Sequence, residues 1–179
     1  MNEKRKKMLD LIYANKDIYY FKGHYWLGDY MPWEPKKITV EEKTRVEEAL
    51  NIKLPESYIW CYENIAHFGV PIEDPLIIMD NTLSMRKYSE KFPQSFIELD
   101  SLDFYQVCLD CDTGNVVYWW EDQEEYDIKF QTFEDYVLYL IEDHIEFLED
   151  DELFEDWFKD MSDYEERLEF RKNKKNIES

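Results

Sequence analysis

Apolar residues near the start of the chain recur at the spacing of an amphipathic helix. This spacing predicts a short helix over residues 3–14, whose apolar face is formed by Met8, Leu9, Leu11 and Ile12. Residues 18–35 break the pattern, because aromatic side chains there occupy nearly every second position among Gly, Asp and Pro. Large aromatic side chains are seldom left fully exposed, so we expect this segment to be a packed flap; the alternative is a partner-binding surface.

Two further helices have clear start and stop signals. Thr39 and Glu42 have the spacing of a capping box, and Asn51 can adopt the left-handed conformation that ends a helix. The buried face predicted between them consists of Val46, Ala49 and Leu50. The next helix begins at Pro55, where no backbone donor is lost, and stops at Gly69.

Short runs of β-branched and aromatic residues predict strands in the middle of the chain. These runs are 76–79, 96–99, 104–111, 115–120 and 126–130. The runs 104–111 and 115–120 flank Asp112-Thr113-Gly114, where glycine can adopt a positive φ, and they therefore predict a hairpin. The run 126–130 predicts an edge strand, and 83–92 predicts a helical crossing.

Helical spacing returns in the last third of the chain. Thr132 caps a long predicted helix that extends to Leu148. After an acidic interruption the spacing resumes from 153 to 168, which predicts one further amphipathic helix. We expect this helix to dock through Leu153, Trp157, Met161 and Leu168, with its acidic residues outward. The basic tail beyond it is expected to fray.

The charge of the chain is strongly negative and unevenly distributed. The formal net charge is -21, and residues 121–179 alone hold 22 Asp and Glu against 7 Lys and Arg. Such a field repels nucleic acid and anionic membranes and attracts basic partners. With 179 residues, 44% of them hydrophobic, the chain is long enough for one folded domain. Three cysteines, no membrane-length apolar run and no secretion signal favour a cytoplasmic protein.

Three signatures of chemistry overlap in CLDCDTGNVVYWWE, from Cys108 to Glu121. Residues three apart on a strand face opposite sides, so Cys108 and Cys111 cannot share one metal; we expect Cys111 in the core and Cys108 on the other face. A single Asp-Thr-Gly cannot form the paired carboxyls of an aspartic protease. A calcium loop requires Gly at position six, whereas this sequence has Gly114 at position five, so an EF-hand is excluded and the stretch is predicted to be a plain hairpin. A weak, nonspecific cation contact of Asp110, Asp112 and Glu121 is the alternative.

The rest of the chain offers no catalytic constellation. Of the three histidines, His24, His67 and His144, only His144 has acids at helical spacing that could ligate a metal, Glu142, Asp143 and Glu146, and no further partner ligand is identifiable. No Gly-rich phosphate loop, nucleophile elbow or H-E-x-x-H motif occurs. The sequence therefore predicts a protein that is not an enzyme and needs no cofactor or metal.

The helix pair ITVEEKTRVEEALNIKLPESYIWCYENIAHFG resembles the signature of the SUKH superfamily, the Smi/Knr-like proteins. The matching positions are Glu47, Leu50, Leu54, Pro55 and Tyr58. Trp33, the hairpin VCLDCDTGNVVYW and the closing TFEDYVLYLIE helix follow in the order of that family. The resemblance covers residues 31–148 and departs from the usual Asn-Gly-Gly at His67-Phe68-Gly69.

The resemblance implies an α+β fold, with a mainly antiparallel sheet packed against helices and an extra acidic C-terminal helix. We expect 1–179 to form a single domain with a SUKH-like core at 31–148. Residues 1–30 would add the N-terminal helix and aromatic flap, and 149–170 the acidic amphipathic helix.

The resemblance also implies an immunity protein, which binds and neutralises a bacterial toxin domain, often a nuclease. The alternative is a non-catalytic regulatory or scaffold protein of the Smi/Knr type. A basic toxin would be met by acids on the hairpin tip and the loop after it, beside whichever of two tryptophans faces outward. The expected partner-binding residues are Asp110, Asp112, Trp119, Trp120, Glu121, Asp122, Glu124 and Glu125. The oligomeric state is left open by the sequence.

Overall fold

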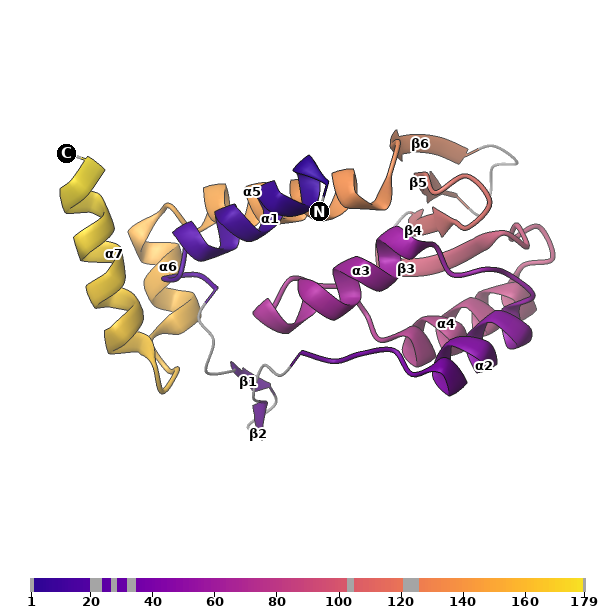
Figure 1. The fold of residues 1–179 in the computed structure, drawn as a ribbon, viewed down its shortest axis with the longest axis horizontal. Coiled ribbons are helices and arrows are strands. Elements are labelled where there is room, and N and C mark those ends of the chain that lie inside the picture. Colours follow the sequence, from indigo (N-terminus) through magenta and orange to yellow (C-terminus); the bar gives the residue numbers. More distant parts are fainter. Residues whose placement is uncertain are drawn as a thin grey trace.

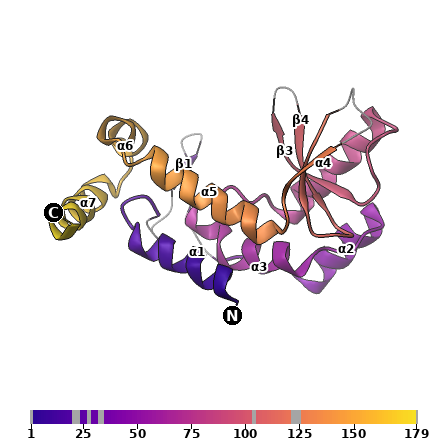
Figure 2. The same cartoon turned by 90° about the horizontal axis from the view of Figure 1, so that it is seen from above.

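The computed structural model describes residues 2–19, 24–26, 29–31, 35–102, 105–120 and 126–178. The molecule is elongated, with a sheet and its covering helices at one end and two C-terminal helices at the other (Figure 1). Three helices, α1 (Glu3–Ala14), α3 (Glu56–Asn64) and α5 (Phe133–Phe147), lie between these ends, and α5 packs against both α1 and α3 (Figure 2).

The sheet is a four-stranded antiparallel meander, in agreement with the mainly antiparallel sheet that the family resemblance implied. Its strands follow the chain in the order β3 (Phe96–Leu102), β4 (Tyr105–Asp110), β5 (Val116–Trp119) and β6 (Tyr126–Phe130). β6 is an edge strand, which confirms that prediction. A separate two-stranded ribbon, β1 (His24–Trp26) and β2 (Asp29–Met31), falls inside the aromatic segment 18–35, much of which lies outside the described residues.

The strand predicted at 76–79 is wrong, because these residues belong to the helix α4 (Pro75–Tyr88). The Asp74 side chain accepts a hydrogen bond from the Leu76 N–H, and Pro75 occupies the first helical position. An apolar run of four residues looks the same in a buried strand and in a buried helix, so the cap is the informative signal. The helical part of 83–92 is the end of this helix and not a separate crossing.

The helix ends follow their predicted signals closely. α2 (Val40–Leu50) begins at a complete capping box between Thr39 and Glu42, and it ends at Asn51 with φ of 53°. Within α2, Val46 and Leu50 are buried but Ala49 is exposed, which narrows the predicted face. α3 is followed by a short 3-10 turn, η1 (Ala66–Phe68), which stops at Gly69 with φ of 90°.

The sheet carries apolar side chains on both faces. On one face Val107, Leu109 and Val116 join the main core, to which α1, α3 and α5 contribute. On the other face a second, smaller core contains Phe92, Phe96, Cys108, Val117 and Trp119, with Met85 of α4 packed against it. Because both faces are covered, strand alternation alone does not reveal which side chains reach solvent.

The C-terminal region forms two helices, so the single helix predicted over 153–168 is wrong. α6 (Asp151–Phe158) and α7 (Tyr164–Glu178) are separated by a turn, and the tail expected to fray is part of α7. α6 contributes Phe154 and Phe158 to the main core, whereas Trp157 is 54% exposed. The predicted contact of Trp157 with the core is therefore wrong, whereas Leu153, Met161 and Leu168 pack partly against the core as predicted.

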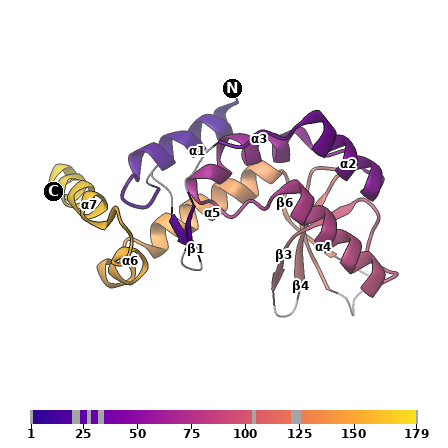
Figure 3. The same ribbon diagram turned by 90° about the horizontal axis from the view of Figure 1, so that it is seen from below.

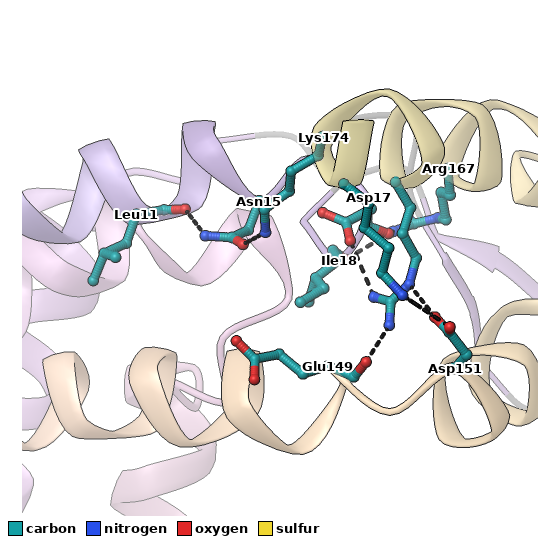
Figure 4. Close-up of polar contacts among 10 residues, drawn as sticks. Leu11, Asn15, Asp17, Ile18, Glu149, Asp151, Arg167 and Lys174 are labelled. Atoms are coloured by element: carbon teal, nitrogen blue, oxygen red, sulfur yellow. Dashed lines mark hydrogen bonds and ion pairs between the residues drawn. The ribbon is translucent and has the colours of Figure 1, made fainter. Parts of the chain in front are cut away.

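α7 lies at the end of the molecule where α1 ends (Figure 3), and buried arginines of α7 bind the turn after α1 (Figure 4). Arg167 is fully buried, and its Nη1 donates to the carbonyl oxygens of Asp17 (3.0 Å) and Ile18 (2.7 Å). Its Nε donates to Asp163 Oδ1 at 2.9 Å. Arg171 reaches Asp17 Oδ2 at 3.2 Å and the carbonyl oxygen of Glu149 at 2.6 Å. The contacts with Asp17 and Ile18 join segments about 150 residues apart in the sequence.

Candidate protein-binding surface

The two adjacent tryptophans at the end of β5 have opposite environments. Trp119 is 2% exposed in the second core, where its ring meets Phe92 edge-on at 5.1 Å. Trp120 is only half-buried. One of the two was expected to face away from the core, and the structure identifies it as Trp120. Trp119 is therefore a packing residue and is not accessible to a partner.

Trp120 belongs to a group of aromatic side chains at this end of the sheet, which we call the sheet-end cluster: Tyr105, Tyr118 and Trp120. The rings of Tyr105 and Tyr118 stack at 4.3 Å, and Trp120 lies 5.6 Å from Tyr105. Lys129 Nζ lies 5.2 Å from the Tyr118 ring and 6.0 Å from the Trp120 ring. A cation is attracted to an aromatic face, so the position of the Lys129 ammonium indicates that these rings can bind a positively charged side chain.

The aromatic surface continues from the sheet onto α5. The ring of Phe130 lies 5.4 Å from that of Tyr139, which is 45% exposed. The Tyr139 hydroxyl donates to Asp143 Oδ1 at 3.4 Å, and the Asp143 carboxylate raises the pKa of Tyr139. Burial raises the pKa of Tyr118. Both hydroxyls therefore stay protonated at neutral pH, and the Tyr139 proton is already donated to Asp143.

Asp110 at the hairpin tip has a structural role. It is 6% exposed, and its carboxylate accepts hydrogen bonds from the Asp112 N–H at 3.1 Å and from Thr113 Oγ1 at 2.6 Å. Gly114 closes the turn with φ of 79°, and its N–H donates to the Asp110 carbonyl oxygen. These bonds form a side-chain-stabilised turn, which explains Asp-Thr-Gly at this place without a metal or protease chemistry. Asp112 is the exposed acid of the tip.

The hairpin tip and Trp120 lie at opposite ends of β5. Val116 pairs with Leu109 next to the tip, whereas Trp119 pairs with Gln106 at the far end. The expected grouping of Asp110 and Asp112 with Trp120 is therefore not observed, because an antiparallel meander places successive connections at opposite ends. The other four predicted acids, Glu121, Asp122, Glu124 and Glu125, lie outside the described residues.

The cysteines occupy different sides of the sheet, but their burial is the reverse of the prediction. Cys108 is fully buried in the second core, and burial raises its pKa well above the ordinary value. Cys111 is partly buried against the main core, and burial, assisted by Asp110 and Asp112, raises its pKa to about 12. Both are therefore protonated at neutral pH, whereas a nucleophilic or metal-binding cysteine is a thiolate.

Two of the histidines, His67 and His144, are partly buried. Burial lowers the pKa of both His67 and His144, which favours their neutral forms. Within the part of the chain that the structure describes, no group of three His, Cys, Asp or Glu side chains could hold a metal ion.

We expect purified protein to contain no stoichiometric zinc. Cys108 and Cys111 pack in separate cores, so one ion cannot bind both thiols without breaking β4. Elemental analysis of the wild type, Cys108→Ser and Cys111→Ser variants measures this directly. One zinc per wild-type chain, lost in either variant, would overturn the expectation.

Comparison with protein families places the chain in a known family. Residues 8–142 match the family model SUKH_5, described as SMI1-KNR4 cell-wall. The match covers most of the chain, so the protein belongs to this SUKH family. SUKH domains are known immunity proteins, and the family is generally non-catalytic and typically binds protein partners. A comparison with curated proteins found no match.

The matched region and the described helices add two facts. The match ends inside α5, so α6 and α7 lie beyond it. None of the helices described is both long and apolar enough to cross a bilayer.

Proposed function

We propose that this protein is an immunity protein that binds and neutralises a cognate bacterial toxin domain, a nuclease. The observation that carries the proposal is the partly exposed Trp120 in the sheet-end cluster, on a strongly acidic chain of a family of immunity proteins. A tryptophan is a frequent anchor of protein interfaces, and its neighbours exclude water around it.

The charge of the protein suits a nuclease as partner. A nuclease active site binds phosphates through a basic groove, so an acidic protein surface can steer association and occupy that groove. The net charge of -21 and the four acids between Trp120 and Tyr126 in the sequence support such a partner. The partner is therefore a protein and not a nucleic acid or a membrane, and the complex forms in the cytoplasm, where a nuclease would act.

The binding residues that we propose are Trp120 as the anchor and Glu121, Asp122, Glu124 and Glu125 as the acidic rim. Asp112 contributes only if the partner is wide enough to reach the hairpin tip as well. Asp110 and Trp119 are not proposed as contacts, because Asp110 stabilises the hairpin tip and Trp119 is buried in the second core.

A regulatory or scaffold role remains the second candidate, because the matching family is described by the Smi/Knr cell-wall proteins. The two functions differ in their expected genomic context. An immunity gene has a toxin gene beside it, whereas a scaffold gene has no such requirement.

The proposal is tested by expressing the toxin-domain gene that neighbours this one in a sensitive host, with and without this protein. We expect growth with the wild type and lost protection with Trp120→Ala. The matched control is Tyr88→Ala, which removes a 73% exposed aromatic side chain from α4. Toxicity that the wild type does not relieve would contradict the proposed function.

A further inference from the structure

The short helix α6 carries three large aromatic side chains, and two of them are already covered by arginines. The Arg171 guanidinium lies 4.3 Å from the Phe154 ring, and that of Arg167 lies 4.5 Å from the Phe158 ring. Both rings are buried. The third, Trp157, is 54% exposed, and no cation lies over it among the residues that the structure describes.

Trp157 forms an exposed apolar patch with a residue of α5. Its ring lies 6.0 Å from that of Phe147, which is 45% exposed, and 5.6 Å from the His144 ring. We call Trp157 and Phe147 the α5–α6 patch. The two rings pack against each other and both are exposed to solvent, and exposed apolar patches commonly mark binding sites.

The surroundings of the α5–α6 patch are acidic. Asp143 lies one helical turn before Phe147 on α5 and is exposed. Asp160 lies three residues after Trp157 and is also exposed. Glu146 and Asp156 add negative charge on neighbouring positions, and Asp156 is paired with Lys159 at 2.8 Å. The negative charge of these residues would attract a cation towards the rings.

We propose that the α5–α6 patch receives an arginine side chain from a basic protein partner. Tryptophan is the aromatic ring that attracts cations most strongly, and the planar guanidinium stacks on a ring while its N–H groups reach carboxylates. A lysine ammonium lacks the planar face and is more strongly hydrated. The same helix already binds two guanidinium groups in this way through Phe154 and Phe158.

The α5–α6 patch is distinct from the sheet-end cluster. It lies at the end of the molecule opposite to the sheet, and Trp157 is beyond the region that matches the family (Figure 1). The inference rests on the proposed function only in taking the partner to be a basic protein. A residue outside the family core is well placed to make this contact specific to one partner.

The test uses a capped hexa-arginine peptide as the probe and capped hexa-lysine as its charge-matched comparison. Peptide is titrated into isotopically labelled full-length protein, and the tryptophan indole N–H signals are followed by nuclear magnetic resonance. We expect the Trp157 signal to shift most, with tighter binding of hexa-arginine than hexa-lysine. Trp157→Ala should weaken hexa-arginine binding by about tenfold, which is a typical loss for one desolvated cation–π contact.

The control variant is Tyr88→Ala, which removes an exposed aromatic ring elsewhere and leaves every acid in place. Equal binding of both peptides, with Trp157→Ala unchanged, would mean diffuse attraction to acids and would overturn the inference. A dimer in sedimentation that Trp157→Ala dissolves, without peptide binding, would assign the patch to a second copy and also overturn it. The titration needs no toxin, so its failure is distinguishable from failure of the proposed function.

Discussion

Replacing Arg167 by methionine is expected to lower the free energy of unfolding by about 3–5 kcal/mol, the typical cost of removing one partner of a buried ion pair. Arg167 is fully buried, and its loss leaves the Asp163 carboxylate, which is 3% exposed, without that partner. It also removes the donor to the carbonyl oxygens of Asp17 and Ile18. Methionine keeps much of the side-chain volume, so the effect reports the polar contacts and not a large cavity.

Chemical denaturation followed by circular dichroism measures this loss, and binding of a hydrophobic dye reports whether α6 and α7 have separated from α5. The matched control is Lys172→Met, which removes an exposed positive charge from the same helix. Its effect should stay within about 0.5 kcal/mol, as for most surface substitutions. Equal stability of Arg167→Met and Lys172→Met would show that the C-terminal helices do not depend on the buried arginine.

Reversing Glu121, Asp122 and Glu124 to lysine is expected to slow association with the toxin domain by roughly tenfold or more at low salt. The three acids follow Trp120 directly in the chain and would steer a basic partner towards it. The association rate of the variant should also depend less on salt, because fewer opposite charges attract each other. Stopped-flow or surface-based kinetics at several salt concentrations gives both quantities.

A charge-matched control separates local steering from the net charge. Reversal of Glu48, Asp80 and Glu90, which are exposed on or after α2 and α4, changes the net charge by the same amount. This variant should keep most of the association rate. If both triple variants associate equally, or if the first binds like the wild type, the acids after Trp120 are not part of the interface.

The local signals in the sequence were sufficient for most of the fold. Several of these signals involve only a few consecutive residues and can therefore be recognised in the sequence. They are the capping box at Thr39, the left-handed Asn51 and the Asp-Thr-Gly turn. α4 was missed because its apolar start at 76–79 was read without the cap at Asp74. The match to a SUKH family confirms the resemblance carried by the second and third helices.

The C-terminal region could not be predicted from periodicity, because long-range contacts determine it. The spacing of apolar residues predicted a single helix, because it does not change at the turn between α6 and α7. Arg171 begins the basic tail that was expected to fray, and Arg167 carried no signal of burial, yet both bind groups about 150 residues earlier. Whether an arginine is buried depends on the carbonyl and carboxylate groups that surround it in the fold, and most of these groups are distant in sequence.

The residues of the candidate binding surface could be predicted only in part from the sequence. Strand alternation showed that Trp119 and Trp120 face opposite sides, but the choice depended on Phe92, which covers Trp119 from a distant segment. The contributions of Tyr105, Tyr118 and Lys129 arise from strand pairing and carried no separate signal in the pattern.

The most direct test of the central claim is a titration of the purified toxin domain with purified full-length protein at physiological salt. Nuclease activity is measured at each ratio, and the mass of the mixture is determined by light scattering. The account predicts that activity falls to background near equimolar protein, together with a stoichiometric complex of the two chains. Full nuclease activity in the presence of excess protein, with both components remaining separate, would contradict it.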